Sequence, residues 1–193
     1  LNASPEEITE GMYWYEKANQ AAEHIAVANH IEVDVVAAVI SALSPRNKWN
    51  RNLEDARKIV QVYVASGGDQ EAVNAVKVGT FNRGKFKAFE LHDGRIGPHE
   101  AFTTALKTKN FYESIMLRID AICIDGHAYA IWLGERTPVQ KTPSITPKMY
   151  EAIAQDYREA TAVINSLTDG CLLPYQLQAI TWVTYRNLHG IGQ

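Results

Sequence analysis

Residues 115–134, IMLRIDAICIDGHAYAIWLG, contain the junction from which we interpret the rest of the chain. A mostly apolar run ends before Asp125-Gly126-His127, and a second apolar segment starts at Ala128. An aspartate in this position is typical of a helix N-cap, because its carboxylate accepts hydrogen bonds from the N–H groups of the first turn. The same position can also hold an ionised carboxylate for catalysis at the positive end of a helix. The other motifs of the chain must decide whether Asp125 is only a helix cap or also has a chemical role.

The composition is that of a soluble globular protein with room for one domain or two small lobes, since 46% of the 193 residues are hydrophobic and 21% are charged. No apolar run reaches membrane-spanning length, and the polar, acidic N-terminal residues do not resemble a signal peptide. Cys123 and Cys171 lie far apart, which fits a reducing compartment and gives no support for a disulfide framework or a metal site. We therefore expect a cytoplasmic protein with no cofactor, no metal and no membrane partner.

Hydrophobic periodicity predicts an all-α protein of about nine to eleven short helices, because almost no stretch alternates as a strand does. Residues 33–44, VDVVAAVISALS, are apolar nearly all round, as a buried central helix would be. The other expected helices cover residues 5–30, 52–65, 69–76, 83–91, a short segment after Pro98, 110–117, a segment from 128, 147–166 and 174–189.

Three basic clusters are candidates for contact with nucleic acid, which the net charge of −3 would confine to local patches. The loop 45–51, PRNKWNR, combines cations and amides with the aromatic face of Trp49, a mixture that suits phosphate contact and base stacking. Residues 79–87 and 107–109 add lysines at expected helix starts, where phosphates bind readily. Each cluster could equally be an ordinary solvated surface, with Trp49 packed on the core. His127 could face the same cleft as Asp125 or bond a backbone carbonyl, and we favour the second.

Five segments in this order resemble the helix-hairpin-helix DNA glycosylase superfamily, which has an endonuclease III-like fold. They are VISALSPRNKWNRNLEDARKI, GTFNRGKFKAFELHDGRI, TALKTKNFYESIML, IDGHAYAIWLG and QLQAITWVTYRNLHG, between residues 39 and 190. The fourth is similar to the superfamily's pattern V-D-T-H-V-x-R-V, whose aspartate is the catalytic carboxylate. The opening of the chain, with S-P-R and W-x-x-N, also resembles phage-encoded relatives.

The resemblance implies a two-lobed helical fold in a single compact unit of residues 1–193. One lobe would cover about 30–127, and the other about 1–29 plus 128–193. Asp125 would be the catalytic carboxylate. Lys107 or Lys109 would stand where some members carry a lysine that forms a Schiff base. DNA-binding or substrate-binding positions would be Leu43 or Ser44 at the intercalating position, Arg46, Asn47, Lys48, Trp49, Arg51, Arg83, Lys85 and His127.

The hairpin is the clearest departure from the superfamily. Its pattern is L-P-G-V-G-[RK]-x-[TS]-A, whereas residues 105–110, ALKTKN, contain no glycine. Glycines permit a close approach of the backbone to a DNA phosphate, so a degenerate hairpin would hold DNA differently. The cysteine cluster that is common at the C-terminus of the superfamily is also absent.

Three functions are compatible with these features. The first is a DNA glycosylase, acting in repair or on modified DNA, that flips a damaged or modified base and cleaves its N-glycosidic bond. Hydrolysis is favoured over an imine and strand break, because Lys107 and Lys109 lie in a polar run. The second is a phage-type transferase of thymine hypermodification that leaves the bond intact. The third is a non-catalytic DNA-binding module. The sequence does not specify which base is recognised, or whether the substrate is duplex, single strand or free nucleotide, and it indicates no protein partner. We expect DNA to be the partner, in the cytoplasm of a bacterial or phage-infected cell.

Overall fold

The computed structural model describes residues 2–138 and 141–192, and all regular secondary structure in this part of the chain is helical. It confirms the predicted all-α class and the expected number of helices. The helices, in chain order, are α1 (Pro5–Met12), α2 (Trp14–Asn29), α3 (Val33–Leu43), α4 (Trp49–Ala65), α5 (Gln70–Ala75), α6 (Asn82–His92), α7 (Pro98–Ala101), α8 (Leu106–Ile115), α9 (Gly126–Leu133), α10 (Pro147–Thr168) and α11 (Pro174–Leu188).

The described residues form two compact units, which we name by their place in the sequence. The central unit is Ala18–Met116, and the terminal unit combines the chain up to Lys17 with Leu117–Gly192. These bounds differ from those expected from the sequence, in which the chain passes from one lobe to the other at about residues 29 and 127. Residues 117–124 belong to the terminal unit because the Tyr150 hydroxyl, on α10, bonds both the N–H of Ile124 and the carbonyl of Ile122.

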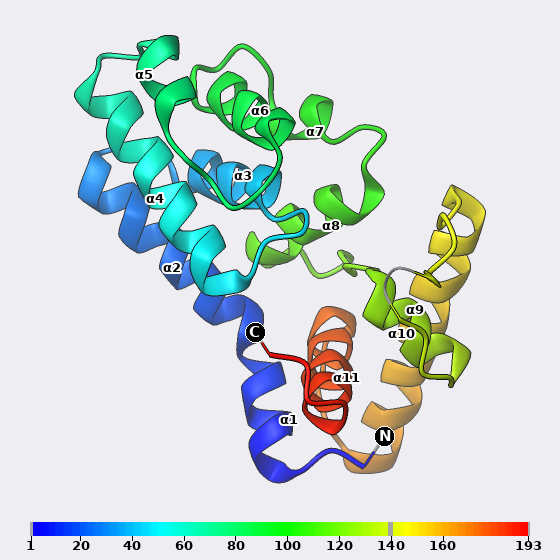
Figure 1. Ribbon diagram of the computed structural model, residues 1–193. Coiled ribbons are helices and arrows are strands. Elements are labelled where there is room, and N and C mark those ends of the chain that lie inside the picture. The colour runs from blue at the N-terminus through cyan, green and yellow to red at the C-terminus, as the bar shows by residue number, and fades with distance from the viewer. Residues whose placement is uncertain (1, 139–140, 193) are drawn as a thin grey trace. The chain divides into compact units, whose positions relative to one another are not determined.

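The core of the central unit is built around α3, as its apolar sequence predicts (Figure 1). Every residue from Val36 to Leu43 is buried, and α3 packs against α4, α6 and α8. The crossing of α3 and α6 depends on Gly84, because a Cβ at this position would lie 2.6 Å from the carbonyl oxygen of Ala42. Such a distance is well inside van der Waals contact, so a larger residue would force the two helices apart.

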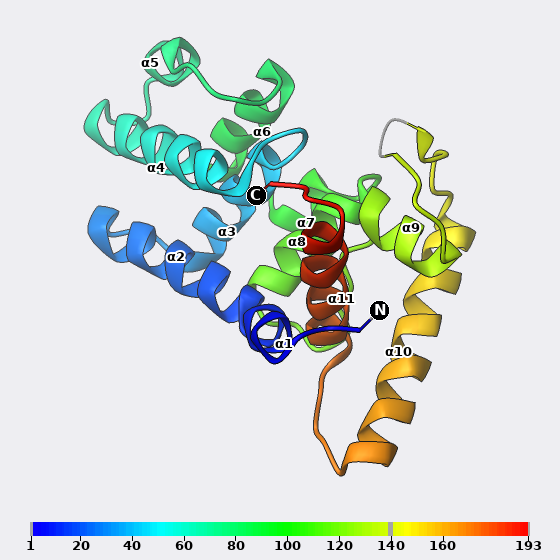
Figure 2. The ribbon, with the colours of Figure 1, turned by 60° about the horizontal axis from the view of Figure 1, so that its bottom comes forward.

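The terminal unit contains α1, α9, α10 and α11 (Figure 2). Its first helix begins with a capping box between Ser4 and Glu7 and with Pro5 at the first helical position. Gly11 then lets α1 approach α11 closely, since a Cβ there would lie 2.3 Å from the Cα of Ile180. Each unit thus contains one glycine at which two helix backbones meet.

The first expected helix, residues 5–30, is divided in two by the structure. Its first segment ends at Tyr13, whose φ of −103° and ψ of 12° depart from helical values, and a new helix starts at Trp14. Elsewhere α4 begins at Trp49, three residues before the predicted start, and α8 ends at Ile115, two residues before the predicted end. Ends are the weakest part of such predictions because they depend on capping and tertiary contacts.

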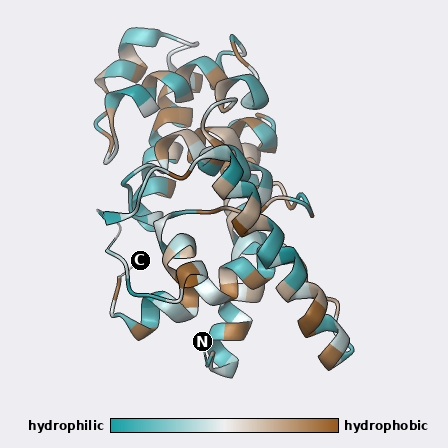
Figure 3. Cartoon of the chain, turned by 90° about the vertical axis from the view of Figure 1, so that its right-hand side faces the viewer, coloured by the Kyte–Doolittle hydropathy of each residue, from teal (hydrophilic) through white to brown (hydrophobic). Residues whose placement is uncertain are grey.

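Hydrophobic and hydrophilic residues occur on the same helices (Figure 3), as expected of amphipathic helices packed against one another. No single helix of the described chain is both long and apolar enough to cross a membrane. Only α2 and α3 taken together reach that length and composition, and they are bent by 118° where they meet. Of the two cysteines, Cys123 is buried and Cys171 is exposed, and both are free thiols.

Candidate active site

The segment before Asp125, residues 121–124, is buried and has no regular secondary structure. Leu117 has a left-handed φ of 56°, which ends the preceding helical direction. The four residues from Ala121 to Ile124 are all buried. The Tyr150 hydroxyl accepts the N–H of Ile124 at 3.0 Å and donates to the carbonyl oxygen of Ile122 at 2.8 Å. These bonds satisfy buried backbone groups that have no strand partner, and they fix the point at which Asp125 begins the next helix.

Asp125 is the N-cap of α9, as its sequence position predicts. Its Oδ1 accepts the backbone N–H groups of His127 and Ala128, both at 2.9 Å. The residue has extended backbone angles and is half-buried. The N-terminal end of α9, which carries a partial positive charge, therefore faces the carboxylate. The helix ends at Gly134, which adopts the left-handed conformation that glycine favours at this position.

The second carboxylate oxygen faces α11. Asp125 Oδ2 accepts the indole N–H of Trp182 at 3.3 Å. One turn further along α11, the guanidinium carbon of Arg186 lies 4.2 Å from the centroid of the Trp182 ring. Burial lowers the pKa of Arg186, and the negative charges of Asp125 and Glu10 act in the opposite direction. Asp125 therefore has an indole donor and a cation beside it, in addition to the end of its own helix.

Aromatic rings gather around this carboxylate. Tyr157 of α10 is buried, its hydroxyl lies 3.2 Å from the Thr181 hydroxyl, and its pKa is raised, chiefly by burial and also by the charge of Asp125. The ring of Trp14 contacts Trp182 edge to face at 5.8 Å between centroids. Such rings give a site flat apolar walls on which a planar base could stack.

His127 lies on the first turn of α9 in the terminal unit, with Asp125. Its ring centroid is 5.7 Å from that of Tyr185, which in turn contacts His189 at 4.4 Å. The backbone N–H of His127 serves the cap, while the imidazole packs among the rings of α11. The described residues include no group of three or more histidine, cysteine or acidic side chains suited to a metal ion.

The expected DNA-binding residues other than His127 all lie in the central unit. Arg46, Lys48, Arg51 and Arg83 are exposed, as contact with a phosphate requires. Asn47 is half-buried, and its amide donates to Asp55 Oδ2 at 2.9 Å. Arg46, Asn47 and Lys48 come from the loop before α4, whereas Arg51 lies in the first turn of α4 and Arg83 in the first turn of α6.

Four of the expected contact residues make contacts within the central unit. Leu43 is fully buried in α3, and the Ser44 hydroxyl caps that helix by donating to the Ser41 carbonyl at 2.8 Å. Trp49 is half-buried and contacts Phe111 edge to face. Lys85 is buried, and its ammonium group donates to the carbonyls of Asn74 and Val76. Each of these four side chains makes its contacts within the central unit, which its position in the sequence does not show.

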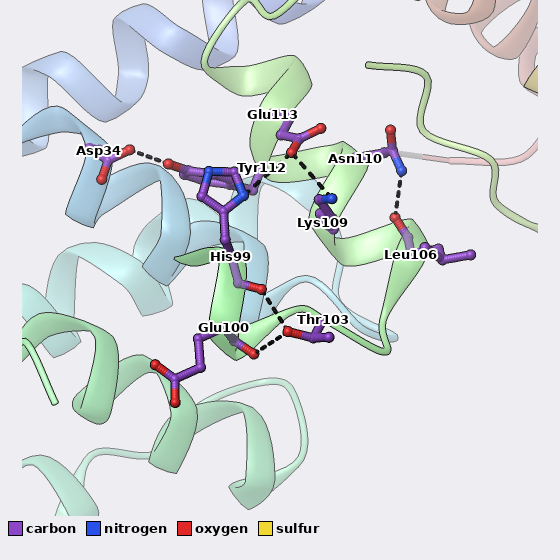
Figure 4. Close-up of polar contacts among 9 residues, drawn as sticks. All are labelled: Asp34, His99, Glu100, Thr103, Leu106, Lys109, Asn110, Tyr112 and Glu113. Carbon is purple, nitrogen blue, oxygen red and sulfur yellow. Dashed lines mark hydrogen bonds and ion pairs between the residues drawn. The ribbon is translucent and has the colours of Figure 1, made fainter. Parts of the chain in front are cut away.

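Lys107 and Lys109 lie at the start of α8, after the short turn that joins it to α7. Figure 4 shows this turn with its polar contacts. Lys109 Nζ is 3.9 Å from Glu113 Oε1, one turn along the helix, whereas Lys107 is exposed. The Tyr112 hydroxyl donates to Asp34 and so ties α8 to α3. Residues 106–110, which make up most of the predicted hairpin, form the start of α8, and the connection from α7 covers residues 102–105.

Trp182, Arg186 and Tyr157 are not among the site residues predicted from the sequence. The four-residue spacing of Trp182 and Arg186 places both on one face of α11, which is a detectable signal. The residue spacing alone does not show that this face meets Asp125, because that contact depends on how α9 and α11 pack.

This chain belongs to a family of unknown function, DUF7178, whose model matches residues 1–189. The match takes in both units. Comparisons with curated proteins and with solved structures found no match. The resemblance to the DNA glycosylase superfamily therefore rests on the sequence motifs.

Proposed function

We propose that this chain is a DNA glycosylase-like enzyme in which Asp125 is the catalytic carboxylate. The observation that carries the proposal is that both carboxylate oxygens of this side chain accept hydrogen bonds, each from a different helix. One oxygen is fixed by two backbone N–H groups of α9, and the other meets the indole of Trp182 beside Arg186. A carboxylate used only as a cap needs the first set of contacts and not the second.

The chemistry suits a half-buried carboxylate with a fixed orientation. Cleavage of an N-glycosidic bond passes through an oxocarbenium-like state, whose positive charge a nearby carboxylate stabilises. Water adds its oxygen to the sugar C1′ as the bond to the base nitrogen breaks. The bonding electron pair leaves with the base, which takes up the proton that water loses. In this scheme Asp125 orients the water and stabilises the sugar cation, and the neighbouring rings stack against the extruded base.

Hydrolysis without a covalent lysine intermediate is the version that the contacts favour. Lys109 lies near Glu113, and Lys107 is on an exposed turn of the central unit. Neither lysine has the apolar surroundings that activate a Schiff-base lysine.

The test is release of a free base from DNA. We would incubate the protein with DNA of several sources, including phage DNA with hypermodified bases, and identify the small molecules released by mass spectrometry. Asp125→Asn should reduce release about 100-fold or more, because it removes the charge while an amide oxygen can still cap the helix.

Asp156 provides a matched control in the same unit. Its Oδ2 accepts the indole N–H of Trp132 at 2.6 Å, so it repeats the aspartate–tryptophan contact at an exposed site. Asp156→Asn should leave release unchanged. Release that survives in Asp125→Asn would refute the assignment. A mass change on a base still in the strand, lost in Asp125→Asn, would replace it with the base-modifying transferase. DNA binding with neither change, equal in all variants, would favour the non-catalytic module.

A further inference from the structure

Two segments of the central unit gather positive charge on one part of its surface. Residues 44–53 contain three cations and residues 77–89 contain four, and neither segment contains an acidic residue. Arg51 connects them, since a Cβ on Gly79 would lie 2.3 Å from its Nε. In a chain with a net charge of −3, this is a concentrated patch.

Hydrogen bonds hold the two segments together. Buried Asp55 of α4 accepts the Asn47 amide at 2.9 Å and the Gly79 N–H at 2.7 Å on the same oxygen. The Thr80 hydroxyl donates to the carbonyl of Pro45 at 2.7 Å. The surface is therefore preorganised, and a ligand would not have to pay for ordering two loops.

An exposed aromatic ring lies within this patch. Phe81, the N-cap residue of α6, is 54% exposed, and the guanidinium carbon of Arg46 lies 5.4 Å from its ring centroid. Phe86, in the second turn of α6, is 46% exposed. Arg46 has a left-handed φ of 55°, an uncommon conformation for a residue other than glycine. The chain fixes Arg46 in this conformation beside the ring of Phe81.

The cations divide into two groups by what they contact. Lys85 and Lys87 donate to backbone carbonyls, so they stabilise the fold. The other cations, Arg46, Lys48, Arg51, Lys77 and Arg83, are exposed, and Arg46 lies against the ring of Phe81. Exposed cations beside an exposed ring match the two chemical parts of an unpaired nucleotide, its phosphate and the face of its base.

We propose that the surface formed by Arg46, Lys48, Arg51, Phe81 and Arg83 binds a single-stranded nucleic-acid segment. A base stacks on Phe81, and the arginines and Lys48 contact the adjoining phosphates. Stacking on Phe81 needs an uncovered base face, which an unpaired strand offers without the cost of unstacking a duplex. This binding does not depend on the chemistry at Asp125, which lies in the other unit.

The experiment is fluorescence anisotropy with a labelled thymidine oligonucleotide and a duplex of equal length, at several salt concentrations. The wild-type protein should bind the single strand more tightly than the duplex. Phe81→Ala should weaken binding of the single strand about tenfold, through loss of one stacking contact. Arg46→Gln should reduce the slope of log K against log salt by about 0.7 for a lost phosphate contact.

Two exposed residues of the terminal unit provide controls. Leu167→Ala removes a comparable apolar surface and Lys148→Gln a comparable charge, and neither should change binding. Asp125→Asn should also bind normally, so loss of base release with binding intact concerns the proposed function alone. Equal binding of single strand and duplex, or unchanged binding by Phe81→Ala, would overturn the inference. Equally strong competition by polyglutamate would assign the surface to an acidic protein instead.

Discussion

Asp55 in the central unit and Asp125 in the terminal unit both accept backbone N–H groups, but they differ in exposure and in the origin of their partners. Asp55 is 2% exposed and bonds two loops that are distant in sequence. Asp125 is half-buried and takes two of its donors from its own helix. A carboxylate that joins distant loops holds the fold together. One that is fixed locally can keep its orientation and still be available for chemistry.

Replacement of Asp55 is the strongest way to test this difference. Asp55→Ala should lower the free energy of unfolding by about 3 kcal/mol, because it leaves the Gly79 N–H and the Asn47 amide without a charged acceptor in a buried place. Urea unfolding measures the loss, and hydrogen exchange should locate it in the central unit. A loss below about 1 kcal/mol, at the level of an ordinary single hydrogen bond, would remove the distinction.

Replacement of Asp125 should cost less. Asp125→Ala removes an N-cap, which is worth about 1 kcal/mol, and faster hydrogen exchange should be confined to the first turn of α9. Differential scanning calorimetry gives the stability change, with Asp156→Ala as the exposed control. A loss as large as that of Asp55→Ala would show that Asp125 is chiefly structural and would weaken its catalytic assignment.

The smallest effect concerns pH and sharpens the contrast between the units. His92 stacks on Tyr63 at 3.9 Å between ring centroids, and burial lowers its pKa from the ordinary value of 6.5. The unfolded chain therefore takes up a proton below pH 6.5 where the folded one does not, so this contribution to stability is present above that pH and is lost on acidification. Asp93, which accepts the Tyr63 hydroxyl and pairs with Arg95, partly offsets the shift.

We expect the stability of the central unit to fall between pH 7 and pH 5, and His92→Phe to flatten this dependence. Urea midpoints at several pH values, with hydrogen exchange to separate the units, provide the measurement. The pKa of Asp93 is also lowered, from 3.8, so its contribution disappears only at lower pH and does not confuse the result. An unchanged slope in His92→Phe would mean that another group is responsible.

Local sequence signals predicted part of this structure well. The N-cap at Asp125 and the buried helix at 33–44 depend on neighbouring residues, and both are present. The residues that contact the Asp125 side chain from other helices were not predictable in the same way. Trp182 meets Asp125 only because α9 and α11 pack together, which no spacing in the sequence encodes.

The basic loops illustrate the same limit. From the sequence, Trp49 was the aromatic residue expected to stack on a base, and Lys85 was expected to contact phosphate. In the structure Trp49 contacts Phe111 and Lys85 bonds two carbonyls, while Phe81 is the exposed ring. Composition indicates that such a surface is basic and aromatic, but exposure of each side chain is decided by tertiary packing.

The reactivity of the two cysteines can be used to measure how often part of the terminal unit opens. Cys171, in the turn between α10 and α11, is exposed, whereas Cys123 lies in the buried segment that leads to Asp125. A thiol reagent should therefore modify the folded protein in two kinetic phases, the first at Cys171 and the second at the rate at which residues 121–124 become accessible. The second phase reports the opening of the segment that leads to the carboxylate, without a cysteine introduced by mutation.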